Sequence, residues 1–429
     1  MKELPPGWQV VPLDDLKAVE PGAITDGPFG SKLTSAHYSA EGARVVRLQN
    51  IGDGVFKEAD AFIPWEHFKS LRKHEVRAGD LLIASLGDDP PRACLAPANL
   101  GPAIVKADCI RVRLAADVDP RWVLYAMRSP DLKRWATEQM HGVGRLRLGL
   151  KTIRALPIPL PSLGEQRRIV ELLDDHLSRL DAAESYLVAV RRRLAAYQQQ
   201  SLETVLTTSS SEHVALGSVV ERVEAGKSFG GSAPPAVGAE WGVIKVSAMT
   251  WGEFQPTENK AVPSGAVNPS YEIAPGDVLV SRANTTAYVG APVLVRETPS
   301  RRLLSDKSLR LVPPPDVNRE WLVAALSAPG TRRQISAAAT GTSDSMRNIS
   351  QKNLLSVQIP WVPVEDQARV VERLSAARTA ASALAQESQR GNARSQGLRR
   401  AVLDAAFSGR LTGHASDMDR VEELAAASS

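Results

Sequence analysis

The chain contains the stretch IPLPSLGEQRRIVE at residues 158–171 and the stretch IPWVPVEDQARVVE at residues 359–372. Ile, Pro, Gln, Arg, Val and Glu stand at matching places in the two copies, 201 positions apart. A long match at a fixed distance is the sequence signature of an internal repeat. The two copies therefore predict a duplicated architecture with a period of about two hundred residues.

Weaker matches lie upstream in the same order. Residues 78–83 read AGDLLI and residues 275–280 read PGDVLV, while VVRL at 45–48 corresponds to VIKV at 243–246. The spacing falls to 197 and 198 positions here, so small insertions separate the copies. The order of these landmarks extends the repeat over nearly the whole chain.

Each repeat begins with a block of mixed character. Short β-branched runs such as 103–105, 110–114 and 293–295 are separated by Gly and Pro, which predicts strands joined by turns. Residues 122–139 and 321–338 predict one helix in each block. We therefore expect two similar α+β domains, at residues 1–163 and 208–363.

Each repeat then becomes helical after a proline-rich boundary, and we expect helices at 164–207 and 364–412. Apolar residues recur at alternating steps of four and three, which is a heptad pattern. The first seam is Ile169, Leu173, His176, Leu180, Ala183, Leu187, Val190, Leu194 and Tyr197. The second is Val370, Leu374, Ala377, Ala381, Leu384, Ser388, Gly391, Ser395 and Leu398. We predict that these two helices pack on each other, although a helical hairpin or a dimerisation coil accounts for the heptads equally well.

Composition excludes several classes of protein. With 43% hydrophobic and 23% charged residues the chain is globular, and its net charge is only +4. It has no run of about 18 apolar residues, and its two cysteines, Cys94 and Cys109, lack metal-ligand spacing. We expect a cytoplasmic protein that does not enter membranes, with a disordered tail at residues 413–429.

The motifs together resemble the DNA-specificity subunit of type I restriction-modification systems. The strongest part of the resemblance is the Ile-Pro motif of residues 158–171, because it occurs twice. Four further stretches are similar to the family: LPPGW at 4–8, DGPFGS at 26–31, GDLL at 79–82 and AFSGRLT at 406–412. The second copy departs from the pattern, since it has KSFGGS at 227–232 in place of DGPFGS.

The resemblance implies a pseudo-twofold fold in which two target-recognition domains are separated by two long antiparallel coiled-coil helices. Each domain would read half of a split site in double-stranded DNA. The family carries two methylation subunits on the helices, which use S-adenosylmethionine, and some members add two restriction/translocase subunits that use ATP and Mg2+ in defence against phage. A helix of about 42 residues is about 60 Å long, enough to separate half-sites one DNA turn apart.

Sequence readout requires cationic, amide or hydroxyl side chains on accessible loops. In the first domain we select the loop 141–147, whose glycines let the backbone approach DNA, and two further basic residues. In the second domain we select the matching loop 341–348 and the segment 282–286. The candidate DNA-binding residues are Lys32, Arg92, His141, Arg145, Arg147, Arg282, Asn284, Thr285, Thr286, Ser343, Ser345 and Arg347.

We predict no catalytic residues, no metal site and no cofactor in this chain. Residues 89–92, DPPR, resemble the tetrapeptide of amino-methyltransferases, but Arg92 stands where an aromatic residue must stack on the flipped base. Residues 226–228, GKS, end like a phosphate-binding loop, but Glu221 stands where the first glycine is required. The competing hypothesis is a coiled-coil scaffold or adaptor whose two mixed domains bind proteins.

Overall fold

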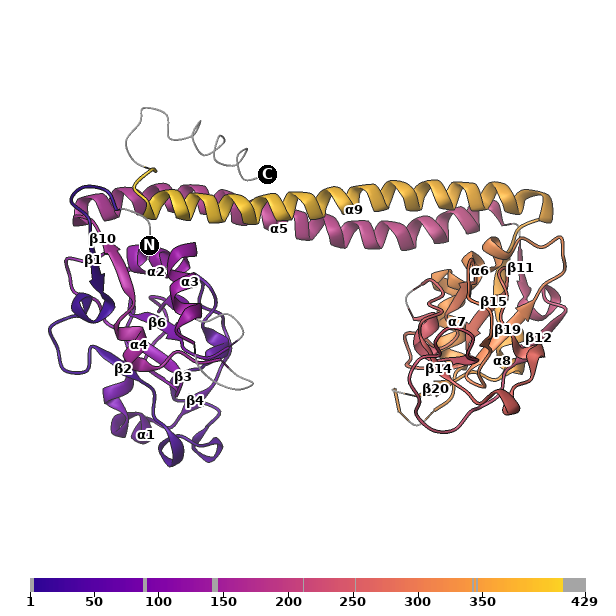
Figure 1. Cartoon of the computed structure of the whole chain (residues 1–429), viewed down its shortest axis with the longest axis horizontal. Coiled ribbons are helices and arrows are strands. Elements are labelled where there is room, and N and C mark those ends of the chain that lie inside the picture. The colour runs from indigo at the N-terminus through magenta and orange to yellow at the C-terminus, as the bar shows by residue number, and fades with distance from the viewer. Residues whose placement is uncertain are drawn as a thin grey trace. The chain divides into compact units, whose positions relative to one another are not determined.

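The computed structural model describes residues 4–87, 91–140, 146–210, 212–250, 252–341, 343–344 and 346–411 (Figure 1). The chain forms two compact units. Unit 1 is built from the residues up to Leu187 and from Gln389 onward, and unit 2 is Val188–Ser388. Each unit thus contains one mixed block and parts of both long helices.

Unit 1 contains two four-stranded sheets and a two-stranded ladder. The ladder pairs β1 (Gln9–Pro12) with β10 (Pro157–Leu160). One sheet has the order β2 (Ile24–Asp26), β9 (Cys109–Val112), β6 (Leu81–Ala84), β7 (Arg92–Leu95). The other has the order β4 (Phe62–Ile63), β3 (Ala43–Val46), β8 (Ala103–Val105), β5 (Glu75–Val76). The short helices are α1 (Trp65–Ser70), α2 (Pro120–Arg128), α3 (Pro130–Glu138) and α4 (Leu150–Arg154).

Unit 2 repeats this arrangement. Its ladder pairs β11 (Glu212–Ala215) with β21 (Gln358–Trp361). Its sheets have the orders β12 (Arg222–Ala225), β19 (Ser308–Val312), β15 (Val278–Ser281), β17 (Pro292–Leu294), and β14 (Asn259–Ala261), β13 (Gly242–Ile244), β18 (Arg302–Leu303). A further pair joins β16 (Ala283–Asn284) to β20 (Arg347–Asn348). The short helices are α6 (Arg319–Ser327), α7 (Pro329–Ala338) and α8 (Gln351–Leu355).

The strand registers show that the two units are copies of one fold. Each contains one parallel pair in an otherwise antiparallel sheet, β3 with β8 in unit 1 and β13 with β18 in unit 2. Each also has a glycine directly after a strand, β2 in unit 1 and β12 in unit 2, where a Cβ would collide with backbone. On Gly27 it would lie 2.0 Å from the carbonyl carbon of Lys106, and on Gly226 it would lie 1.9 Å from the carbonyl oxygen of Leu304. Gly226 is therefore the structural counterpart of Gly27, although the residues that follow the two glycines differ.

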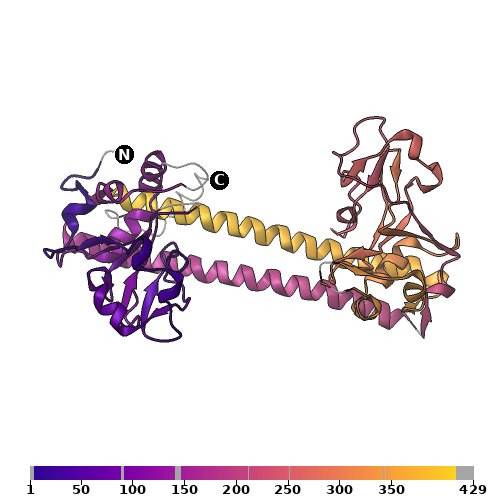
Figure 2. The same cartoon turned by 90° about the horizontal axis from the view of Figure 1, so that it is seen from below.

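Two long helices run through the chain, α5 (Leu163–Ser209, 47 residues) and α9 (Val364–Phe407, 44 residues). Figures 1 and 2 show them side by side. In unit 1, Ser395 Oγ donates to Glu184 Oε1 at 3.0 Å and Arg399 pairs with Asp181 at 2.5 Å, so the later residue of α9 meets the earlier residue of α5. In unit 2, Arg373 donates to Ser209 Oγ at 3.3 Å. The helices are antiparallel, as predicted.

In both long helices, apolar residues of the heptad seam pack against the mixed blocks. In unit 1, Ile169 and Leu173 are fully buried in one core with Leu403 and Phe407. In unit 2, Leu206 is buried in one core with Val370. The middle of the second seam has small residues, and a Cβ on Gly391 would lie 3.3 Å from Leu187 Cδ1, so the small side chains permit a close approach of the two helices.

Three predicted seam residues do not lie on the contact face. Ala183 is exposed, and Tyr197 and Leu384 are 54% and 57% exposed. An α-helix has 3.6 residues per turn, so a strict heptad drifts by about 20° per repeat and the contact moves to neighbouring positions. Ala385 and Glu184 are accordingly more buried than the residues that precede them.

The single helices predicted at 122–139 and 321–338 are each two helices. Pro130 begins α3 and Pro329 begins α7, because proline lacks the N–H that would continue the preceding helix. The spacer helices also differ from prediction by a few residues, since α5 spans 163–209 and α9 ends at Phe407. Thr412 and the predicted tail, residues 413–429, lie outside the described residues.

The repeated glutamine of the Ile-Pro motif joins each long helix to its block. Gln166 accepts a hydrogen bond from the Asp119 N–H at 3.0 Å and donates to the Pro161 carbonyl at 3.0 Å. Gln367 accepts from the Asn318 N–H at 2.8 Å and donates to the Val362 carbonyl at 3.0 Å. Both side chains are buried, at 1% and 0% exposed, so each amide satisfies backbone groups that water cannot reach.

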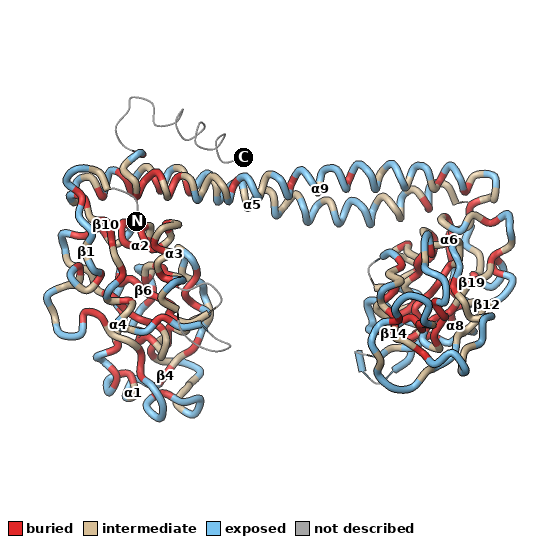
Figure 3. The backbone as a smooth tube through the Cα atoms, in the orientation of Figure 1, coloured by how far each residue is buried: buried red, intermediate tan, exposed pale blue. Residues whose placement is uncertain are grey.

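Burial is concentrated in the two blocks (Figure 3). Trp122 and Trp321 stand at matching positions, both fully buried. Trp122 packs edge-on against Trp8, with ring centroids 5.4 Å apart, and Trp321 packs edge-on against Trp361 at 5.3 Å. In the part of the chain that the structure describes, no helix is long and apolar enough to cross a bilayer.

Candidate nucleic-acid interface

The structure brings together two of the predicted reading segments in unit 2. Asn284 pairs with Arg347 and Ala283 pairs with Asn348 in the short β16–β20 ladder. The Thr286 N–H and hydroxyl both bond Asp344, the hydroxyl at 3.2 Å. The segment 282–286 and the described part of the loop 341–348 therefore form one edge of unit 2, which we call the unit 2 edge.

The side chains on this edge differ in accessibility. Asn284 is 8% exposed, and its amide donates to Ser281 Oγ at 3.2 Å and accepts from the Thr285 N–H at 2.8 Å. Arg347 donates to the carbonyls of Ala339 and Gly341. These two residues hold the edge together, whereas Thr285 and Thr286 are exposed and Arg282 is half-buried.

Three of the twelve predicted residues, His141, Arg145 and Ser345, lie outside the described residues. Ser343 is described and exposed.

In unit 1, Arg147 lies in a charged cluster at the end of two strands. Its guanidinium pairs with Asp108 at 2.7 Å, lies 4.0 Å from Asp26 and stacks over the ring of Phe29 at 5.7 Å. Its backbone pairs with Leu86, which makes this the counterpart of the β16–β20 ladder. Phe29 is 49% exposed, so the cluster opens to solvent.

The other two predicted residues of unit 1 occupy separate places. Arg92 is on β7, and its guanidinium lies beside Gly87, at 3.6 Å from where a Cβ would stand; it therefore shares the strand end with Arg147. Lys32 is exposed on a separate turn, where its carbonyl oxygen lies 2.9 Å from His67 Nε2. The structure thus groups Arg92 with Arg147 and leaves Lys32 apart.

The Asp26 carboxyl is the most perturbed acid of this cluster. Burial raises its pKa to about 6, and the neighbouring Asp108 adds to the rise. Hydrogen bonds from the N–H groups of Gly27 and Asp108, at 2.7 and 3.1 Å, and the charge of Arg147 oppose it. The carboxyl is therefore half protonated near pH 6.

Unit 2 contains a basic cavity that the sequence did not single out. This cavity has a volume of about 390 Å³ and is lined by four lysines, which come from four separate segments. These lysines are Lys227, Lys245, Lys260 and Lys307. They are spread over 81 positions of the chain, so no basic run marks them, and only the fold brings them together.

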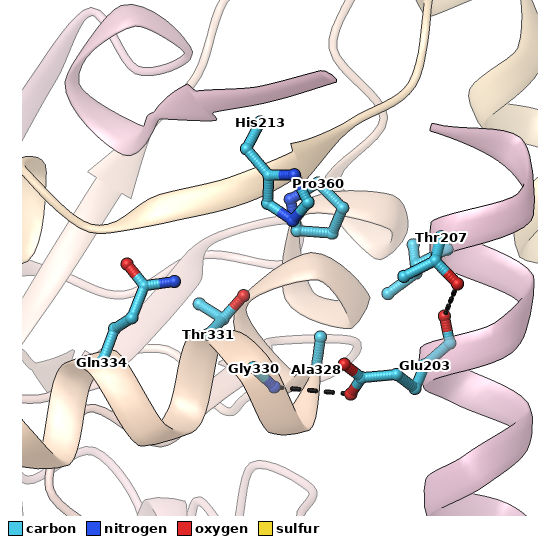
Figure 4. Close-up of a pocket in the computed structure, with 9 residues that line it drawn as sticks. Glu203, Thr207, His213, Ala328, Gly330, Thr331, Gln334 and Pro360 are labelled. Carbon is cyan, nitrogen blue, oxygen red and sulfur yellow. Dashed lines mark hydrogen bonds between the residues drawn. The ribbon is translucent and has the colours of Figure 1, made fainter. Parts of the chain in front are cut away.

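A much smaller pocket of unit 2, of about 40 Å³, lies where α5 meets α7 (Figure 4). Glu203 of α5 accepts a hydrogen bond from the Gly330 N–H at 3.4 Å, at the start of α7. A carboxylate is favourable there because the first N–H groups of a helix lack partners. The pocket is large enough for about one water molecule and so is too small for a ligand. Its residues serve to join α5 to α7.

Catalytic chemistry is not apparent among the described residues. They contain no group of three or more His, Cys, Asp or Glu side chains that could hold a metal ion. Both cysteines are buried, which raises the pKa of Cys94 to about 12 and that of Cys109 further. Neither thiol is therefore a nucleophile at neutral pH.

Comparison with known proteins gives a consistent family of relatives. The family model described as "Type I restriction modification DNA specificity domain" matches residues 101–186. The type I restriction enzyme EcoEI specificity subunit of Escherichia coli is 32% identical over 162 residues, which cover 37% of this chain and 27% of that subunit. The EcoKI specificity subunit of Escherichia coli K12 is 22% identical over 96% of this chain and 90% of its own length.

Two solved structures share the fold. One chain, from work on "complex assembly and conformational transition of the type I R-M system", has a TM-score of 0.71 at 21% identity. The match covers 96% of this chain and all of that one. The HsdS subunit from Thermoanaerobacter tengcongensis has a TM-score of 0.52 at 22% identity and covers 96% of this chain and 99% of its own.

Proposed function

We infer that this chain, a relative of the type I restriction-modification specificity subunits, reads a split site in double-stranded DNA. Unit 1 would read one half-site and unit 2 the other. The two units differ in sequence, so the half-sites need not be related by symmetry.

The observation that carries this proposal is the duplicated fold with a polar edge at the same place in each copy. In unit 1 this place holds Arg92 and Arg147, and in unit 2 it holds Arg282, Thr285 and Thr286. Arg is suited to guanine and hydroxyls bond to base edges or phosphates, so both edges carry residue types that read DNA. The relatives named above are specificity subunits, which favours this function over that of a general scaffold.

We further propose that catalysis resides in partner chains. Two methylation subunits would dock on the long helices of each chain and would bind S-adenosylmethionine. Restriction subunits, where present, would bind ATP and Mg2+. The exposed apolar side chains of α5 support a protein-binding role, since Tyr186, Val188 and Tyr197 are 65%, 43% and 54% exposed. Large apolar side chains in water mark sites of protein association.

Mapping of methylated adenine in the native host tests the proposal. The wild-type strain should carry methylation at a two-part motif with an unread gap, and deletion of this chain should remove it. A map that is unchanged by the deletion would refute the assignment.

A second measurement separates DNA reading from protein scaffolding. The chain assembled with its methylation subunit should bind the mapped motif with an affinity that falls steeply as salt rises, because binding releases counterions from the phosphates. A complex that does not bind the motif at low salt would instead favour a protein scaffold.

A further inference from the structure

The basic cavity of unit 2 is formed where four segments converge. Lys227 follows β12, Lys245 follows β13, Lys260 lies on β14, and Lys307 precedes β19. Asp306 is the acidic residue of the lining. The cavity therefore carries a large excess of positive charge.

One of the four lysines holds the cavity wall, and three face solvent. Lys260 Nζ donates to the carbonyls of Phe229 and Gly231, the latter at 2.7 Å, and so fixes the loop that follows Lys227. Lys227, Lys245 and Lys307 are exposed and form no ion pair with the residues that the structure describes. Their charges are available to an anion.

The cavity adjoins the unit 2 edge at Lys307. The Lys307 carbonyl accepts hydrogen bonds from the N–H groups of Arg282 and Ala283, at 2.9 and 3.3 Å. A ligand on Lys307 would thus lie next to the segment that we propose reads bases. This adjacency favours a nucleic-acid phosphate over an unrelated small anion, because backbone contacts position the protein for base contacts.

Unit 1 has a cation, Arg47, in place of Lys245, but it lacks the lysines at the positions of Lys227 and Lys307. The strand registers align Asp26 with Ala225 and Pro28 with Lys227, and they align Asp108 with Lys307. Two carboxylates thus stand in unit 1 near the place where unit 2 has two lysines. In unit 1 these carboxylates are paired with Arg147, so less net positive charge is left for an anion.

We propose that the lysine cavity of unit 2 binds a backbone phosphate of the DNA half-site that this unit reads, and that unit 1 has no equivalent phosphate site. This rests on the proposed function. The lysine ammonium is a compact charge with rotatable donors, suited to a phosphate that approaches without a fixed bidentate geometry. The two units then share a fold but hold the duplex by different electrostatics.

The test uses the complex of the full chain with its methylation subunit, and DNA that carries the methylated motif. Binding is measured from low to high salt for the wild type and for the double variant Lys227→Gln, Lys307→Gln. Affinity falls as salt rises, and loss of a phosphate contact should make the plot of log affinity against log salt less steep by about one unit of slope. It should also weaken binding to all sequences similarly. The methylated motif should not change.

Arg296→Gln is the matched control. Arg296 is a surface cation of unit 2 that does not line the cavity and is paired with Glu320 at 2.8 Å. Its slope should match the wild type. Thermal melting of all three proteins checks that each is folded, and Lys245→Gln gives a second, single-site variant if the double variant is not.

The outcomes distinguish this inference from the proposed function. If the wild-type complex shows no preference for the motif, both fail. If the wild type is specific but the lysine variants keep its slope, the phosphate site is refuted and the proposed function stands. A third outcome is that the wild type binds inorganic phosphate or ATP, the lysine variants do not, and the salt dependence of DNA binding is the same in both. This outcome also refutes the phosphate site for DNA.

Discussion

At the scale of single residues, the carboxyl of Asp26 makes the stability of unit 1 depend on pH. Its side chain is only 13% exposed, and burial raises its pKa from 3.8 to about 6. A raised acid pKa means that the folded state binds a proton more tightly than the unfolded chain. This group therefore stabilises the fold least above pH 6, where the folded state must hold a desolvated carboxylate.

Asp26→Asn should remove this pH dependence. Asparagine keeps an oxygen that can accept from the N–H groups of Gly27 and Asp108, but it has no charge to desolvate. At pH 4 the variant and the wild type should melt alike, because Asp26 is protonated in the folded state. At pH 7.5 the variant should be more stable by about 1 to 3 kcal/mol, since one pKa unit corresponds to about 1.4 kcal/mol. Denaturant titrations at the two pH values measure the difference.

The exposed Asp15 provides the control, because Asp15→Asn changes the same charge without changing a buried group. It should have the same effect at both pH values. A variant of Asp26 that is less stable than the wild type at pH 7.5 would show that the pair with Arg147 outweighs burial.

Residue chemistry could be predicted from the sequence only in part. Loop position and residue type singled out Arg147 and the segment 282–286, but they could not reveal that Asn284 is turned inward to Ser281. They also could not reveal the lysine cavity, since its members are ordinary single lysines in separate segments. Long-range strand pairing decides both, and local sequence does not encode it.

At the scale of elements, the repeated glutamine fixes where each long helix meets its block. Gln166→Ala would leave the Asp119 N–H and the Pro161 carbonyl without a partner in a buried place. Each unsatisfied buried group costs about 1 to 3 kcal/mol, so we expect a loss of about 2 to 5 kcal/mol in the free energy of unfolding. Urea denaturation measures it.

Arg167→Ala is the neighbouring control, since Arg167 is exposed and its removal should change stability by about 0.5 kcal/mol or less. Gln367→Ala should repeat the effect of Gln166→Ala in unit 2, through Asn318 and Val362. Equal stability of the glutamine and arginine variants would contradict a structural role for the amide.

Helical periodicity predicted both long helices to within a few residues, because a sustained heptad seam without proline admits few other folds. It did not predict the breaks at Pro130 and Pro329, where the apolar pattern continues across a proline that starts a new helix. The exposure of Leu384 was missed for a geometric reason, since the heptad assumed a period that a straight helix does not keep. The repeat showed that Gln166 and Gln367 correspond, but not that both bond backbone groups of the adjacent block.

At the scale of the whole molecule, the duplicated fold predicts that the two halves of the DNA site can be exchanged separately. Replacing residues 208–363 by the corresponding segment of a relative should change one half of the methylated motif and leave the other half unaltered. The physical reason is that each unit has its own hydrophobic core. Methylation mapping of the chimera against the parent measures the change, and alteration of both halves together would contradict independent reading.

Unit 1 is built from two segments that are far apart in the chain, and this affects how it folds during synthesis on the ribosome. Its core joins Trp122 to Phe407, whose rings lie 4.6 Å apart, and also takes in Val402 and Leu403. The apolar surface of the first block therefore stays uncovered until residues 402–407 have left the exit tunnel. Unit 2 is one continuous segment and has no such delay. Nascent chains in which residues up to 388 have left the tunnel, but the residues after them have not, should thus hold a native second block beside a first block that is open to proteases and chaperones.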